Sequence, residues 1–282
     1  NILKNIKTDN DFVSPLRKLR PSNLAGGINV AFFWKQNDSD IYGRRQDMMV
    51  KYLSKNAHIN KIMHFDQPIQ MGALKDMKSS DEMSQSNFIY KNTLERIDHR
   101  ADENAIFKRT FVYKGAFKES EYLKFIEEGL AEANMQVVDT IFWFCPIIPS
   151  QKKITEYFKP LKIVSDVIDD QTQFTNNLKV KQSYKEQYKF ALETSVLNLC
   201  NTDTVEEKFV KDGFALKRIT NGAEFFTDEE LEAWPMPKDL DGLQKPILGY
   251  VGNLDPVRLD LELIEGIAKA NPTSSLVFIG SA

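Results

Sequence analysis

Unbroken apolar runs alternate with amphipathic stretches along most of the chain. A strand buried on both faces of a parallel sheet is apolar throughout, whereas an amphipathic helix repeats its apolar positions every three to four residues. We predict strands at 28–34, 137–144, 162–168, 196–200 and 216–219, and helices at 44–55, 119–134 and 180–195. This alternation predicts an α/β fold with a mostly parallel sheet. The stretch 66–104 shows neither period, and we expect loops or short helices there.

A short helix is expected directly after the strand at 196–200. Thr204 and Glu207 have capping-box spacing, in which each side chain bonds a backbone amide of the helix start. Gly213 stands where a left-handed residue would end that helix. The helix should therefore begin at Thr204 and end just before Gly213.

Pro235 and Pro237 lie in an acidic stretch, 223–244, that has the composition of a domain boundary. A second βαβ unit follows, with strands at 247–251 and 275–280 around a helix at 260–271. We predict a linker or terminal arm at 1–27, one domain at 28–240 and the incomplete start of another at 245–282. The polar start without an initiating Met reads as an internal cut.

Composition restricts the class of protein. Hydrophobic residues make up 42% and charged residues 27% of the 282, as in globular proteins, and the net charge of -3 gives no electrostatic footprint for nucleic-acid binding. No apolar run reaches the roughly 20 residues of a membrane-spanning helix. Cys145 and Cys200 lie in apolar strands, where thiols act as small hydrophobes, so a cytoplasmic setting is expected.

Three stretches in order resemble one family, the GT-B glycosyltransferases of bacteria that build surface polysaccharides. The first, INVAFFWKQNDSDIYGRRQDMMVKYLSK, looks like the opening strand, its loop and the "R-R/S-Q" helix start; IVSDVIDDQTQF is similar to "Y-D-x-x-D-D-W-x-x-F". The third, from ITNGAEFF to VFIGS, looks like "I-P-N-G-V-D-x-x-x-F" and the first βαβ unit of the donor domain. The resemblance spans most of 28–282. It implies a Rossmann-like acceptor domain, the first third of a donor domain and a cleft between them.

Asp166, Asp169 and Asp170 end a predicted buried strand, and ligands of open α/β sheets gather at the carboxyl ends of strands. A carboxylate there could accept the proton of an attacking hydroxyl, and we favour Asp170 as this base. Aspartate is also favoured as a helix cap and as a turn residue, so these aspartates fit a structural role as well. Gln171 stands where the family has an aromatic residue.

Donor binding is predicted at two turns. Asn221 and Gly222 form a turn in which Gly can take a positive φ, and the resemblance places it beside the donor. The family's Pro before this pair is Thr220 here, and its acidic residue is kept as Glu224. At the second turn, backbone amides and a cation could bind a diphosphate; the candidates are Gly252, Asn253 and Arg258. Stabilising a departing nucleoside diphosphate in this way needs no metal or cofactor.

Arg44 and Arg45 begin a predicted helix, where cations oppose the helix dipole. A solvated helix start is the simple reading; contact with an anionic acceptor is the functional one. The Asp38-Ser39-Asp40 sequence fits a metal-binding D-x-D pattern that also arises by chance, and the three histidines have no zinc-ligand spacing.

The resulting hypothesis is a cytoplasmic enzyme, at the inner face of the membrane or free of it, with a nucleotide sugar as donor. Its acceptor would be a saccharide or a lipid-linked molecule. Two alternatives stay open: a saccharide-binding or assembly partner without catalysis, and a nucleotide-sugar epimerase of the same architecture. The sugar, the linkage, the stereochemical outcome and the oligomeric state stay open at this point.

Overall fold

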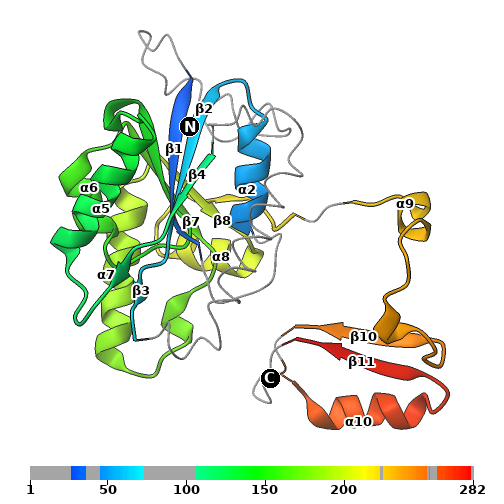
Figure 1. Ribbon diagram of the computed structural model, residues 1–282. Coiled ribbons are helices and arrows are strands. Elements are labelled where there is room, and N and C mark those ends of the chain that lie inside the picture. The colour runs from blue at the N-terminus through cyan, green and yellow to red at the C-terminus, as the bar shows by residue number, and fades with distance from the viewer. Residues whose placement is uncertain are drawn as a thin grey trace. The chain divides into compact units, whose positions relative to one another are not determined.

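The structure is a computed structural model that describes residues 27–35, 45–72, 106–222, 225–252, 254 and 259–280. The chain divides into two compact units, 1–223 and 224–282, and each is considered by itself (Figure 1). This division falls at the start of the boundary stretch expected from the sequence. The predicted arm at 1–27, apart from Gly27, lies outside the described residues, and the predicted domain limits stay a prediction.

Helices and strands alternate in the first unit from α5 (Glu119–Glu132) onward. In chain order they are β1 (Ile28–Lys35), α2 (Arg45–Ser54), β2 (Ile59–Asp66), β3 (Ile69–Gln70), β4 (Ile106–Arg109), β5 (Val112–Tyr113), α5 (Glu119–Glu132), the 3-10 turn η1 (Val137–Asp139), β6 (Thr140–Phe144), α6 (Gln151–Phe158), β7 (Lys162–Val167), the 3-10 turn η2 (Gln171–Gln173), α7 (Leu178–Thr194), β8 (Leu197–Cys200), α8 (Asp203–Lys211) and β9 (Lys217–Arg218). Among the described residues no helix is long and apolar enough to cross a membrane.

Seven of these strands form one sheet in the order β4-β2-β1-β6-β7-β8-β9, and every neighbouring pair is parallel. The chain builds outward from β1 in one direction and then from β6 in the other, which is the doubly wound order of Rossmann-like folds. The predicted α/β class with a Rossmann-like parallel sheet is therefore confirmed. The direction reverses between β1 and β6, so ligands are expected near the carboxyl ends of these strands.

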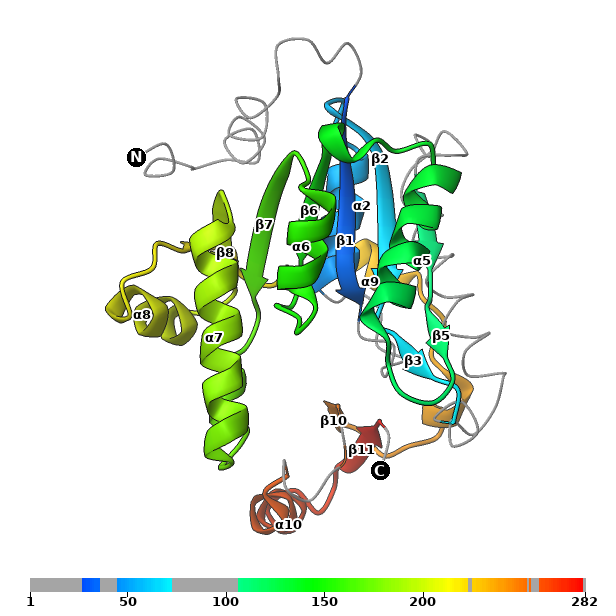
Figure 2. The ribbon, with the colours of Figure 1, turned by 90° about the vertical axis from the view of Figure 1, so that its left-hand side faces the viewer.

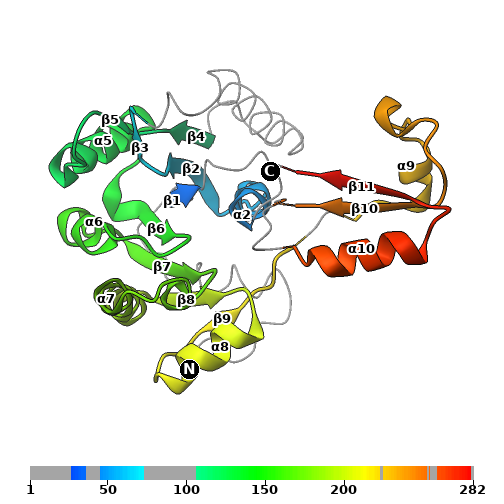
Figure 3. The same cartoon turned by 90° about the horizontal axis from the view of Figure 1, so that it is seen from below.

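Helices cover both faces of the sheet, as Figure 3 shows, with α5, α6 and α7 on one face and α2 on the other. Alternate residues of β1 serve the two layers: Ala31 and Phe33 pack with the α5 and α6 residues, whereas Val30 and Phe32 pack with Val50 of α2. Such double burial explains why β1 is apolar throughout. Figure 2 shows α7 extending past the end of the neighbouring strands.

The second unit contains the short helix α9 (Asp228–Glu232), the 3-10 turn η3 (Lys238–Leu240) and then β10 (Ile247–Val251), α10 (Leu261–Ala270) and β11 (Ser275–Ile279). Strands β10 and β11 pair in parallel, so the βαβ unit predicted here is confirmed. None of the α10 side chains is buried.

The N-cap of the helix after β8 lies two residues earlier than the sequence analysis expected. The hydroxyl of Thr202 accepts a hydrogen bond from the amide of Val205, which makes Thr202 the N-cap, and Thr204 lies inside the helix. The predicted capping box of Thr204 and Glu207 is thus wrong. The helix end is as predicted, because Gly213 follows it with a φ of 92°.

Replacing Thr202 with Ala should lower the free energy of unfolding by about 1 kcal/mol, because an amide of the first turn loses its partner. The matched control is Thr204→Ala, which should change the free energy by no more than about 0.5 kcal/mol, since Thr204 caps nothing and Ala favours the helix interior. Urea unfolding followed by circular dichroism measures both. A larger loss for Thr204→Ala would contradict this helix start.

Candidate functional site

The carboxyl ends of the parallel strands bring several predicted residues to one edge of the first unit. Strand β7 ends at Val167 and leads into Asp169 and Asp170, while β9 leads into Asn221 and Gly222. Helix α2 starts at the same edge because it follows β1. The strand order, rather than proximity in sequence, therefore assembles this edge.

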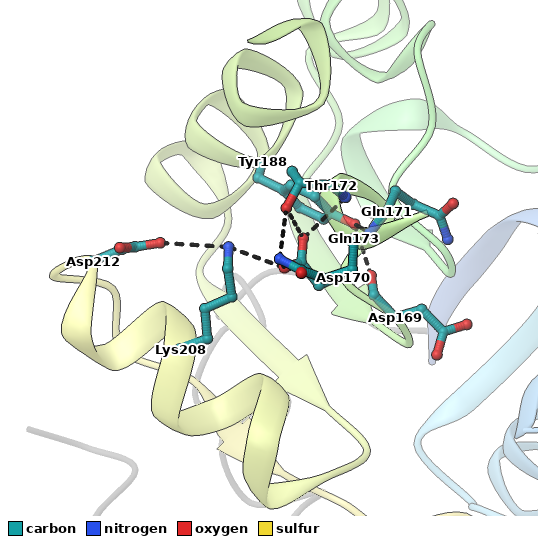
Figure 4. A network of polar contacts seen from close by, with 8 residues as sticks. All are labelled: Asp169, Asp170, Gln171, Thr172, Gln173, Tyr188, Lys208 and Asp212. Atoms are coloured by element: carbon teal, nitrogen blue, oxygen red, sulfur yellow. Dashed lines mark hydrogen bonds and ion pairs between the residues drawn. The ribbon is translucent and has the colours of Figure 1, made fainter. Parts of the chain in front are cut away.

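Asp170 lies at the centre of a hydrogen-bond network, drawn in Figure 4. Its Oδ1 accepts bonds from the backbone amide and the hydroxyl of Thr172, at 3.1 and 2.6 Å. Its Oδ2 accepts a bond from Gln173 Nε2 at 2.9 Å and lies 3.1 Å from the ammonium of Lys208. Both oxygens are thus occupied, and the bond to the Thr172 amide makes Asp170 the N-cap of η2.

These contacts govern the protonation of Asp170. Burial alone would raise its pKa, but the hydrogen bonds from Thr172 and Gln173 and the ammonium of Lys208 outweigh burial, so the pKa is lowered. A carboxyl whose pKa is lowered in the folded state stabilises the fold at every pH above the ordinary aspartate pKa of about 3.9. This contribution is lost as the pH falls through the lowered pKa. Such a group is a weak proton acceptor at neutral pH.

Asp169 has different surroundings. Its side chain is exposed and has no hydrogen bond or ion pair to the described residues, and Figure 4 shows it directed away from the Asp170 network. Its backbone is held, because the Tyr188 hydroxyl donates to the Asp169 carbonyl at 2.7 Å and accepts from the Gln171 amide at 2.9 Å. A fixed turn therefore presents one available carboxylate at the edge of the sheet.

Arg45 is buried and bonded on every side of its guanidinium. Its Nε and Nη2 donate to the two carboxylate oxygens of Asp166 in β7, each at 2.9 Å, and its Nη1 donates to the Ile219 carbonyl at 2.5 Å. The neighbouring Gln46 side chain donates to the carbonyl of Cys145, which follows β6. To contact an acceptor, Arg45 would have to leave Asp166. Its predicted acceptor role is untested, and Arg44 lies outside the described residues.

Asp166 belongs to the strand-end aspartate cluster predicted from the sequence, but only Asp169 and Asp170 of that cluster were selected as catalytic candidates. Burial raises the pKa of Asp166 and the guanidinium of Arg45 opposes that shift. The thiol of Cys145 lies 3.6 Å from the Asp166 carboxylate, and burial raises the pKa of this thiol well above its ordinary value. The thiol is consequently protonated at neutral pH and is no nucleophile there.

The predicted donor residues are divided between the units. Asn221 and Gly222 are exposed after β9, and φ of Gly222 lies outside the left-handed region, so the expected turn with positive φ is wrong. Gly252 belongs to the second unit, where its amide donates to the Ile279 carbonyl at 2.9 Å and is not a bare phosphate-binding group as expected. Asn253, Arg258, Glu224 and the Asp38-Ser39-Asp40 sequence lie outside the described residues.

No protein-family model matches the chain, and no curated protein matches it. Among solved structures, the chain is similar to Arabidopsis thaliana UGT89C1 complexed with UDP, at 11% identity and a TM-score of 0.44, over 91% of this chain and 70% of that one. A likeness of this degree identifies no site.

Proposed function

We propose that this protein is a metal-independent GT-B glycosyltransferase. It moves a sugar from a nucleotide diphosphate to a saccharide or lipid-linked acceptor in surface-polysaccharide synthesis. One observation carries the proposal: the exposed carboxylate of Asp169 on a fixed turn at the carboxyl end of β7. The ordered resemblance of three stretches, from the first strand to the second unit, supports the same class of reaction.

In the proposed reaction, an acceptor hydroxyl oxygen forms a bond to the anomeric carbon of the donor sugar. The bond from that carbon to the diphosphate oxygen breaks, and the nucleoside diphosphate leaves with the electron pair. Asp169 accepts the hydroxyl proton, because its carboxylate is accessible while that of Asp170 is occupied. Asp170 instead holds the turn, which revises the preference drawn from the sequence.

Donor-binding roles are proposed for Asn221 and Gly222 in the first unit and, separately, for Gly252, Asn253 and Arg258 in the second. An amide side chain suits the polar donor, and an arginine suits its diphosphate because the planar guanidinium can bond two oxygens at once. With the Gly252 amide bonded to Ile279, the charge on the diphosphate is left to Arg258.

The assay follows release of nucleoside diphosphate from a panel of nucleotide sugars, with and without a mixed saccharide and lipid-linked acceptor fraction. We expect release that depends on acceptor. Conversion of the nucleotide sugar without acceptor would favour an epimerase instead. Saturable donor binding without any turnover would favour a binding protein and overturn the proposed transfer.

A further inference from the structure

The guanidinium of Arg45 joins segments that are far apart in the sequence. Its Nε and Nη2 donate hydrogen bonds to Asp166, 121 positions away, and its Nη1 donates to the carbonyl of Ile219, 174 positions away. The side chains of Arg45 and Asp166 are only 4% and 0% exposed. Because this guanidinium is almost fully buried, its role follows from the groups to which it donates hydrogen bonds.

Ile219 is the last anchored residue before the predicted donor turn. Its amide donates to the carbonyl of Cys200 at 2.8 Å, and its carbonyl accepts from Arg45. Strand β9 itself has only two residues, Lys217 and Arg218, and lies at the end of the sheet. Beyond Ile219 the chain is exposed through Asn221. The location of Asn221 therefore depends on the two bonds made by Ile219.

A contribution to the free energy of unfolding does not by itself explain a buried ion pair such as Arg45 and Asp166. Burying an ion pair costs much of what its attraction returns, and apolar residues of similar volume often stabilise a fold equally well. Directional bonds are what the apolar substitute lacks, since a bidentate guanidinium fixes both distance and orientation. Asp166 lies three residues before Asp169, so the same pair connects the carboxylate turn to the donor turn.

We infer that Arg45, acting with Asp166, is a positioning residue that fixes the Ile219 carbonyl and thereby sets where Asn221 lies relative to Asp169. The inference rests on the proposed function only for its catalytic consequence. Its structural part concerns Ile219 and is measurable without any turnover.

The test uses the double variant Arg45→Met with Asp166→Leu, which replaces both charges by apolar groups. Hydrogen exchange measured by NMR should show the Ile219 amide exchanging at least about ten-fold faster, as loss of one charge-assisted hydrogen bond implies. The amide of Met135, which is buried and donates to the Leu130 carbonyl at 2.8 Å after α5, has no contact with Arg45 or Asp166; it is the internal control and should keep its rate. A general loss of stability would accelerate both amides.

Unchanged exchange at Ile219, or equal acceleration at Met135, overturns the inference. Should the double variant not fold, Arg45→Lys replaces it, because a lysine keeps the charge beside Asp166 without the third bond to Ile219. The same pattern at the two amides is expected for it. In the transfer assay, KM for the nucleotide sugar should rise about ten-fold with kcat within about two-fold. A fall in kcat at constant donor KM would overturn the positioning of Asn221. A protein without transfer activity would count against the proposed function and leave the exchange result valid.

Discussion

Phe33→Ala is expected to lower the free energy of unfolding of the first unit by about 3–5 kcal/mol. The Phe33 ring is fully buried in β1 and lies among three others, with centroid distances of 5.2 Å to Phe65, 5.2 Å to Phe142 and 4.8 Å to Phe144. Truncation removes the apolar area of one ring and leaves a cavity that neighbours in the two adjacent strands, β2 and β6, cannot fill. Guanidinium unfolding followed by fluorescence measures the loss.

Phe174→Ala is the matched control, because that phenylalanine lies at the end of η2 with 70% of its surface exposed. The same atoms are deleted without a cavity, so the expected change is within about 0.5 kcal/mol. Equal losses in the two variants would mean that Phe33 does not occupy a packed core, and the layered arrangement around β1 would be wrong.

The sequence predicts best those elements whose burial follows a simple rule. Strands β1, β6 and β8 are apolar for most of their length and β7 for half of its length, and all four were predicted. Strand β2 was missed because its buried face includes His64 and Asp66, which look like loop residues in sequence. Helix α6 was missed for another reason: it has eight residues, of which only Gln151 and Ile154 are buried.

The site was harder to predict because its contacts are tertiary. Arginine at a helix start was recognised as unfavourable with the helix dipole, yet the sequence gave no means of pairing Arg45 with an aspartate in β7. Likewise, an Asp after a strand fits both a proton acceptor and a helix cap. Only the bonds from Thr172, Gln173 and Lys208 distinguish Asp170 as the cap.

Asp169→Asn is expected to reduce kcat for sugar transfer by about 10²–10⁴, the range for removing a positioned proton acceptor, while the thermal midpoint stays unchanged. The amide keeps the shape of the side chain and breaks no hydrogen bond or ion pair to the described residues. Product formation under saturating donor, with thermal unfolding followed by circular dichroism, measures both quantities.

Asp170→Asn is the matched variant, one residue away and with the same atoms exchanged. An amide has only one acceptor oxygen, so its NH2 group must face the donors of either Thr172 or Gln173 and Lys208, and the free energy of unfolding should fall by about 1–3 kcal/mol at pH 7. The folded-state pKa of Asp170 is lowered, so this difference should shrink as the pH falls through that value, where the native carboxyl also becomes protonated. If Asp170→Asn abolished transfer with its stability intact while Asp169→Asn remained active, the roles of the two aspartates would be reversed and Asp170 would be the proton acceptor.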